Sequence, residues 1–183
     1  MNYNPMLTFL SEGSIKSHIE YLRGERLRHS IEEKSFPEIK GKSPKEISSM
    51  NIKKSIKSEI LPRLVNIKLH ENYFSSFSST PTTCKPIKKF YSSEDAFLYE
   101  ILNIAKGAEY GFLYITADER RAPRIRLSVE SDRVFVREFP ILSLDLCEHA
   151  YFPDYSFDRD KYLRAALAHL DLSKLKTALD TTK

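Results

Sequence analysis

The sequence predicts an α+β protein, with an N-terminal antiparallel α-hairpin followed by a C-terminal α/β domain that holds a three-stranded antiparallel sheet. Apolar residues recur at helical spacing through most of the first 73 positions, whereas positions 110–136 are rich in aromatic and β-branched residues separated by short turns. With 183 residues and 41% apolar content, the chain can bury a core. The predicted boundaries are a helical hairpin at 1–76, a linker at 77–89 and an α+β domain at 90–183.

Two apolar periods define the hairpin. The first predicts a helix over residues 15–31, with Ser14 as its N-cap. A polar stretch that begins around Pro37 interrupts the pattern. The second period then predicts one long helix over residues 47–73, kinked before Pro62.

The second half mixes helices with short strands. A helix is predicted over residues 96–106, capped by Ser92 or Ser93 and closed by Gly107. Strands are predicted at 110–116, 124–129 and 133–136. Further helices are predicted at 144–151, 158–169 and 172–179.

Charge is the only indication of a nucleic-acid partner. Lys and Arg total 29 against 25 Asp and Glu, a net charge of +4 that an ordinary solvated surface also explains. Several lysines nevertheless cluster in one stretch and make the positive potential local: Lys40, Lys42, Lys45, Lys53, Lys54 and Lys57.

The cysteines and the first residues of the chain indicate the cellular compartment. Cys84 and Cys147 lack the spacing of a disulfide framework or a thiolate metal site. We find no signal-peptide or transit-peptide pattern and no run that could span a bilayer, so a cytoplasmic protein without membrane insertion is expected.

The segment LDLCEHAYFPDY, residues 144–155, contains the most informative pattern. Asp145 and His149 lie four apart, so on a helical turn both side chains would face one way and could share a metal ion. The same spacing also fits a surface pair or a cap.

The surrounding letters, D-x-x-E-H-A-Y followed by Lys-Tyr-Leu, resemble the C-terminal metal motif of iron/manganese superoxide dismutases. The segment KLHENYF places His70 where that family has another ligand. The resemblance implies one iron or manganese ion per subunit, bound by His70, Asp145 and His149, and superoxide or another small anion as substrate. It also implies a homodimer, in which Glu148 supports the partner subunit's ligand histidine.

The first helix departs from the family pattern. The family has E-Y-H-x-G-K-H-H where this chain reads EYLRGERL, so Leu22 stands at the position of the first histidine ligand and cannot coordinate a metal. His18 and His29 face the same way, but a helical turn rises about 5.4 Å, and we expect both to lie too far to replace the missing nitrogen.

Other positions of the family's site are altered as well. The gateway tyrosine falls on Ser30 or its neighbour His29, and the glutamine of the second helix falls on Asn66, which makes Ser30 and Asn66 the candidate catalytic residues. A tyrosine that helps to bridge subunits maps to Phe152. Each change removes or shortens a hydrogen bond to the network around the metal.

Three hypotheses follow. The first is a dismutase-like metalloprotein with altered or reduced activity. The second is a degenerate, metal-free relative that serves as a scaffold or as a (ribo)nucleoprotein or other binding module. The third is a different iron chemistry, such as oxygen or peroxide activation, at a site of two histidines and one carboxylate.

Overall fold

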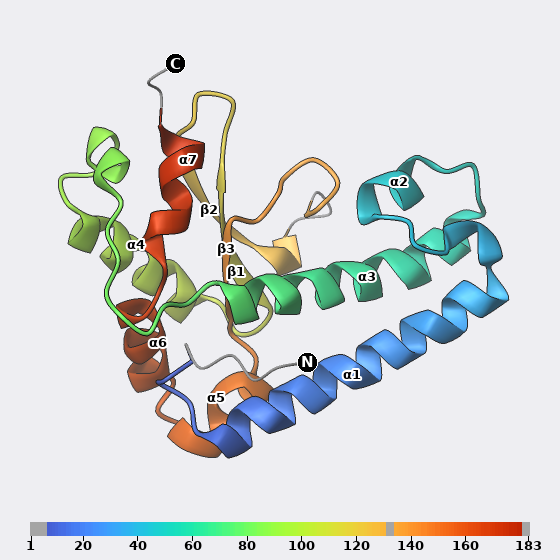
Figure 1. The fold of residues 1–183 in the computed structure, drawn as a ribbon, viewed down its shortest axis with the longest axis horizontal. Coiled ribbons are helices and arrows are strands. Elements are labelled where there is room, and N and C mark those ends of the chain that lie inside the picture. Colours follow the sequence, from blue (N-terminus) through green and yellow to red (C-terminus); the bar gives the residue numbers. More distant parts are fainter. Residues whose placement is uncertain (1–6, 131–133, 181–183) are drawn as a thin grey trace.

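Two long helices lie side by side and lead into a mixed half built around a small sheet (Figure 1). The computed structural model describes residues 7–130 and 134–180. Helix α1 (Glu12–Ser35) packs along α3 (Lys54–Ser75), and the short α2 (Pro44–Ser49) covers the far end of α3. The predicted α+β class, with a helical N-terminal region and a three-stranded antiparallel sheet, is confirmed.

The sheet has the strand order β2-β1-β3, and both pairings are antiparallel. Its strands are β1 (Phe112–Ala117), β2 (Pro123–Leu127) and β3 (Leu142–Asp145). The prediction of a third strand at 133–136 is wrong, because Val134 forms only an isolated bridge with Glu138, while Arg133 lies outside the described residues. The letters LSLD of β3 alternate apolar and polar residues, but the strand is only four residues long, and its last two residues were assigned to the helix predicted at 144–151.

The long second helix is also divided. Ser43 and Glu46 form a capping box, and Pro44 occupies the first turn, so a separate short helix begins there. The chain leaves helical geometry at Met50 before α3 begins. In α1 the N-cap is Ser11, not Ser14, because the Ser11 hydroxyl accepts the hydrogen bond from the Ser14 backbone N–H.

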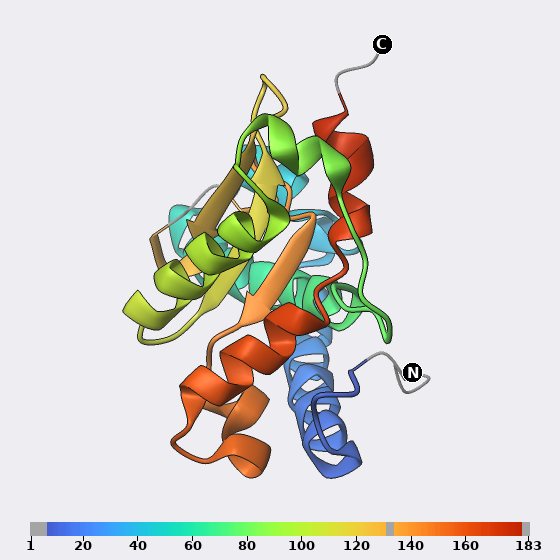
Figure 2. The same ribbon diagram turned by 90° about the vertical axis from the view of Figure 1, so that its left-hand side faces the viewer.

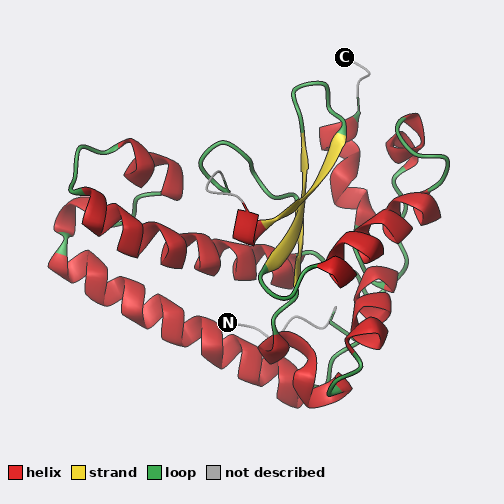
Figure 3. Cartoon of the chain, turned by 180° about the vertical axis from the view of Figure 1, so that it is seen from behind, coloured by secondary structure: helices red, strands yellow, loops and turns green. Residues whose placement is uncertain are grey.

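The remaining helices lie to one side of the sheet and below it in the orientation of Figure 1, and the two other ribbon views show the same arrangement (Figures 2 and 3). They are α4 (Glu94–Gly107), α5 (Glu148–Tyr155), α6 (Arg159–Ala168) and α7 (Leu175–Leu179). Single 3₁₀ turns lie at Pro37–Ile39, Lys85–Lys89, Ser128–Glu130 and Leu172–Lys174. Helix α4 has the predicted cap at Ser93, and Asp158 caps α6.

One hydrophobic core joins the two halves of the chain. Ile15 of α1 and Tyr73 of α3 belong to the same buried cluster as Phe97 of α4 and Leu144 of β3. The division at 1–76, 77–89 and 90–183 therefore stays a prediction, while a shared core is observed. Within the described ranges, no helix is both long and apolar enough to cross a bilayer.

Ile101→Ala in α4 tests this core. The side chain is fully buried in the main cluster, so we expect the free energy of unfolding to fall by about 2–5 kcal/mol. Tyr99→Ala on the same helix is the control, because Tyr99 is 66% exposed and should change stability by less than about 0.5 kcal/mol. Urea denaturation followed by circular dichroism measures both; equal losses would contradict the assignment of the buried face.

Candidate metal centre

Four side chains from four different elements converge between the hairpin and the sheet. His18 comes from α1, His70 from α3, Asp145 from the last position of β3, and His149 from the first turn of α5. One ligand atom from each lies within 4.8 Å of all the others. Three imidazoles and one carboxylate form a nitrogen and oxygen donor set that suits a first-row transition metal.

The Oδ2 atom of Asp145 is the focus of the cluster. It lies 3.1 Å from His149 Nε2, 3.2 Å from His18 Nε2 and 3.5 Å from His70 Nε2. Its other oxygen, Oδ1, accepts a hydrogen bond from the Cys147 backbone N–H at 2.9 Å. The carboxylate is thereby oriented with one oxygen toward the backbone and the other toward the imidazoles.

His70 is held in the tautomer that metal binding requires. Its Nδ1–H donates to the Asn66 carbonyl oxygen at 2.8 Å, which leaves the Nε2 lone pair facing the cluster. Burial lowers the pKa of His70 to about 4, although the charge of Asp145 and the bond to Asn66 oppose this shift. The ring is therefore neutral at neutral pH, the form that donates electrons to a metal.

The pKa of Asp145 is shifted by opposing effects. Burial alone would raise the pKa of this fully buried carboxyl, but the contacts with His149 and His18 outweigh burial and hold the pKa well below its usual range. Asp145 therefore carries a negative charge inside the protein.

His18 supplies an observation that tests whether a metal fits. Both of its ring nitrogens are buried, and neither has a hydrogen-bond partner, because the approach to Asp145 Oδ2 is close but poorly aligned. Buried polar atoms without partners are uncommon and costly. A cation coordinated by His18 Nε2 would satisfy one of these nitrogens, so the residues present fit a bound metal.

Aromatic rings surround the imidazoles. Tyr21 stacks on His149 with ring centroids 4.4 Å apart, and Phe112 meets the edge of His70 at 4.9 Å. Phe74 packs against His18, with ring centroids 5.0 Å apart. These contacts fix the ring planes and limit water at the centre.

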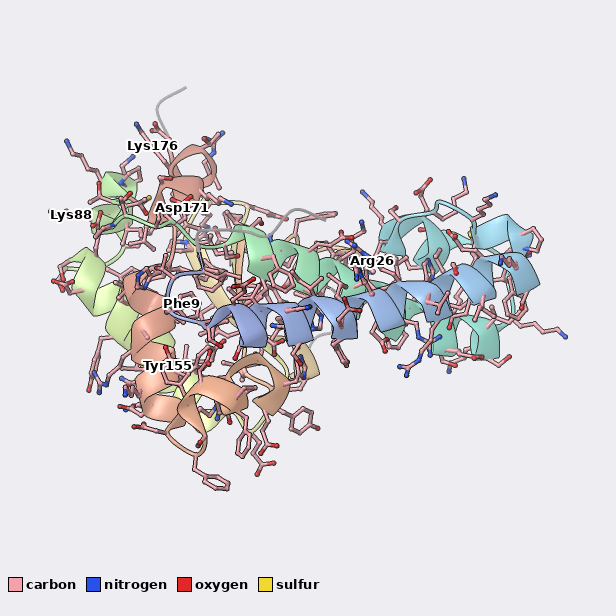
Figure 4. All side chains as sticks on the ribbon, turned by 60° about the horizontal axis from the view of Figure 1, so that its bottom comes forward. Phe9, Arg26, Lys88, Tyr155, Asp171 and Lys176 are labelled. Carbon is pink, nitrogen blue, oxygen red and sulfur yellow. The ribbon has the colours of Figure 1, made fainter. Side chains whose placement is uncertain are left out.

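Interactions away from the centre set the position of α1. Arg26 pairs with Glu71 of α3 at 2.7 Å, and the Tyr155 hydroxyl donates to the Phe9 carbonyl oxygen just before α1. Figure 4 shows these anchors at two separated points along α1. Together these two contacts hold α1 against α3 and α5. In this position of α1, His18 lies at the centre.

The convergence of His70, Asp145 and His149 matches the expected geometry, but two expectations about α1 are wrong. His18 was expected to lie too far from the centre, yet it contacts Asp145 and is 1% exposed. Leu22, read as the missing ligand position, is a buried apolar residue one turn further along. The error was to take the helix register from the letters EYLRGERL, whereas the packing of α1 selects the turn before them.

The other predicted site residues separate into two groups. Asn66 lies beside the centre, where its side-chain Nδ2 donates to the Tyr21 hydroxyl at 3.5 Å. Ser30 does not, because it lies twelve residues beyond His18, about 18 Å along the helix, and its hydroxyl donates to the Leu27 carbonyl. His29 instead pairs with Glu32 at 3.1 Å.

Sequence reasoning missed Tyr21 altogether. The signal that could have found it is its spacing from His18: three positions apart on a helix place both side chains on neighbouring parts of one face. Glu148 is exposed and Phe152 is 41% exposed, so their roles at a subunit interface stay predictions.

Comparison with known proteins agrees with this geometry. Residues 79–178 match the family model for the C-terminal domain of iron/manganese superoxide dismutases. The chain is also similar to superoxide dismutase [Fe] 3, chloroplastic, of Arabidopsis thaliana, with 31% identity over 87 residues. That alignment covers 46% of this chain and 33% of the relative, so the match spans about one third of the relative's length. This chain belongs to the iron/manganese superoxide dismutase family.

His18→Ala tests the unexpected member of the cluster. If His18 is a ligand, metal content after growth in iron- or manganese-supplemented medium should fall at least about tenfold, because one of four donors is lost. His29→Ala is the matched control on the same helix and should keep the parent's metal content. Elemental analysis of the purified proteins measures both.

Leu22→His provides the opposite test. Because position 22 does not carry the missing ligand, the new imidazole should bring no gain in metal content and should destabilise the core in which Leu22 is buried. A clear gain in metal would contradict the register described above.

Proposed function

We propose that this protein binds one iron or manganese ion per chain through His18, His70, Asp145 and His149 and converts superoxide to oxygen and hydrogen peroxide there. The observation that carries the proposal is the convergence of four donor atoms, one of them anionic, in a chain of this family. With His18, the donor set has three histidines and one carboxylate. The hypothesis of oxygen or peroxide activation rested on a site of only two histidines and one carboxylate, so this donor set no longer supports it.

The metal, when bound, would supply one-electron exchange with the substrate. Dismutation consumes two superoxide anions and two protons and yields one oxygen and one hydrogen peroxide molecule. Asp145 brings one negative charge to the site, and neutral His70 brings none, so a bound cation would keep a net positive charge that attracts a small anion.

Tyr21 is the group best placed to handle protons. Burial raises the pKa of its hydroxyl, with the hydrogen bond from Asn66 partly opposing the shift. The phenol therefore stays protonated at neutral pH and can donate a proton. Its ring stacks on His149 while 40% of the residue remains exposed, so it links the centre with solvent.

Metal analysis and activity measured together test this function. Protein purified from supplemented cells should contain about one iron or manganese per chain and should remove superoxide in proportion to its metal content. Removing the metal with a chelator should abolish the activity, and restoring it should return the activity. Stoichiometric metal without turnover would reject dismutation while retaining the metal site.

Tyr21→Phe separates proton transfer from metal binding. Phenylalanine keeps the ring that packs on His149 but removes the hydroxyl, so metal content should stay constant while superoxide turnover falls by at least about tenfold. Tyr99→Phe, an exposed substitution on α4, is the control and should change neither quantity. If Tyr21→Phe left turnover unchanged, the proton-transfer role would be wrong.

A second candidate is a metal-free scaffold or nucleic-acid-binding module, favoured by the lysine-rich stretch from Lys40 to Lys57. Lys42 pairs with Glu46 and Lys57 donates to a backbone carbonyl, whereas Lys40 and Lys45 are exposed. This candidate predicts that the purified protein holds no metal and binds RNA with an affinity that falls steeply as salt rises.

A homodimer and a cytoplasmic location remain part of the main proposal. Light scattering of the purified protein tests whether it is a dimer.

A further inference from the structure

An open cavity of about 1010 Å³ lies beside the candidate metal centre. Leu61 and Val65 of α3 form one wall, and Tyr110 and Val136 line it from the C-terminal half. The lining is mainly apolar, and its volume is at the upper end of the range of small-molecule sites. A cavity of this kind buries an apolar body far larger than superoxide.

Positive charge stands at one end of the cavity. Lys54 and Lys57, from the first turn of α3, are among its lining residues, and no Asp or Glu of the described chain lines it. The Lys57 ammonium donates to the Ser48 carbonyl oxygen at 2.9 Å, and in the described ranges neither lysine forms an ion pair with a carboxylate. Both charges therefore remain available to an anionic group.

The opposite end is formed by Tyr21 and Asn66, which lie against the imidazoles of the centre. From Lys54 to Asn66 the cavity follows α3 over twelve residues, about 18 Å of helix. The site is thus elongated, with cationic groups at one end and apolar side chains along its length.

We propose that this cavity binds an amphipathic monoanion, a small molecule with one carboxylate or similar group and an extended apolar body. The anionic group pairs with Lys54 and Lys57, and the apolar body lies along Leu61 and Val65. Charge complementarity selects the anion, and burial of apolar surface supplies most of the affinity. This binding needs neither a metal nor superoxide, so it stands apart from the function proposed above.

Calorimetric titration with three probes tests the proposal on the full chain, both metal-loaded and chelator-treated. Decanoate carries charge and tail, acetate carries the charge alone, and decyltrimethylammonium carries a comparable tail with the opposite charge. Decanoate should bind with one site per chain in both preparations, while acetate and the cation should bind at least about tenfold more weakly. No decanoate binding, or equal binding of decanoate and the cation, would overturn the proposal.

Paired charge variants then locate the site. Lys54→Gln with Lys57→Gln should weaken decanoate binding about fivefold at low salt, the effect of two partly exposed ion pairs. Lys40→Gln with Lys45→Gln removes the same charge from exposed positions outside the cavity and should leave the affinity unchanged. Equal weakening by both pairs would show that decanoate responds only to overall charge and would reject the site.

A third variant tests the apolar wall. Tyr110 is 62% exposed, so Tyr110→Ser should fold normally while removing apolar area from the cavity. Decanoate binding should weaken and acetate binding should not change. If Tyr110→Ser bound decanoate as the parent does, and circular dichroism showed a native fold, the assignment of the apolar body to this cavity would be wrong.

Discussion

The buried carboxylate of Asp145 is the constraint on which the rest of the structure depends. A charge removed from water costs several kcal/mol unless partners compensate for it. Here one oxygen receives the Cys147 N–H, while the other lies within 3.5 Å of an Nε2 atom from each of His18, His70 and His149. The three imidazoles therefore surround this oxygen together, and a cation at their centre would compensate the carboxylate and one of the two unpartnered nitrogens of His18.

This requirement couples elements that are remote in the sequence. The Tyr162 hydroxyl of α6 donates to the Asp145 backbone carbonyl at 2.8 Å and lies 3.4 Å from the Tyr73 hydroxyl of α3. The same α3 supplies His70, whose orientation is set by its own helix through Asn66. Residues around the centre are therefore positioned by contacts from both halves of the chain. This agrees with the single hydrophobic core that the hairpin and the sheet share.

The sequence predicted most of this arrangement, and its errors have physical causes. Asp145 and His149 could be singled out because they lie four apart in one short motif, whereas His70 was assigned only through the resemblance to the iron/manganese superoxide dismutase family. Asp145 was placed on a helix, although it ends β3, because its spacing of four from His149 fits a helical turn and the alternating strand LSLD is too short to outweigh that spacing. His18 was rejected because the letters EYLRGERL set the expected ligand position at Leu22, although His18 shares the buried face of α1 with Ile15 and Leu22.

The chain contains no tryptophan, so smaller aromatic residues form the layer around the centre. Tyrosine and phenylalanine pack on the imidazoles here, and a large apolar cavity begins on the other side of that aromatic layer. Tyr21 belongs to both, since its ring stacks on His149, its hydroxyl meets Asn66, and its side chain lines the cavity. A molecule seated in the cavity would change the solvation of that hydroxyl, and hence its pKa, because desolvation is the largest cause of the shift. Binding in the cavity and proton supply at the centre are therefore linked through a single side chain.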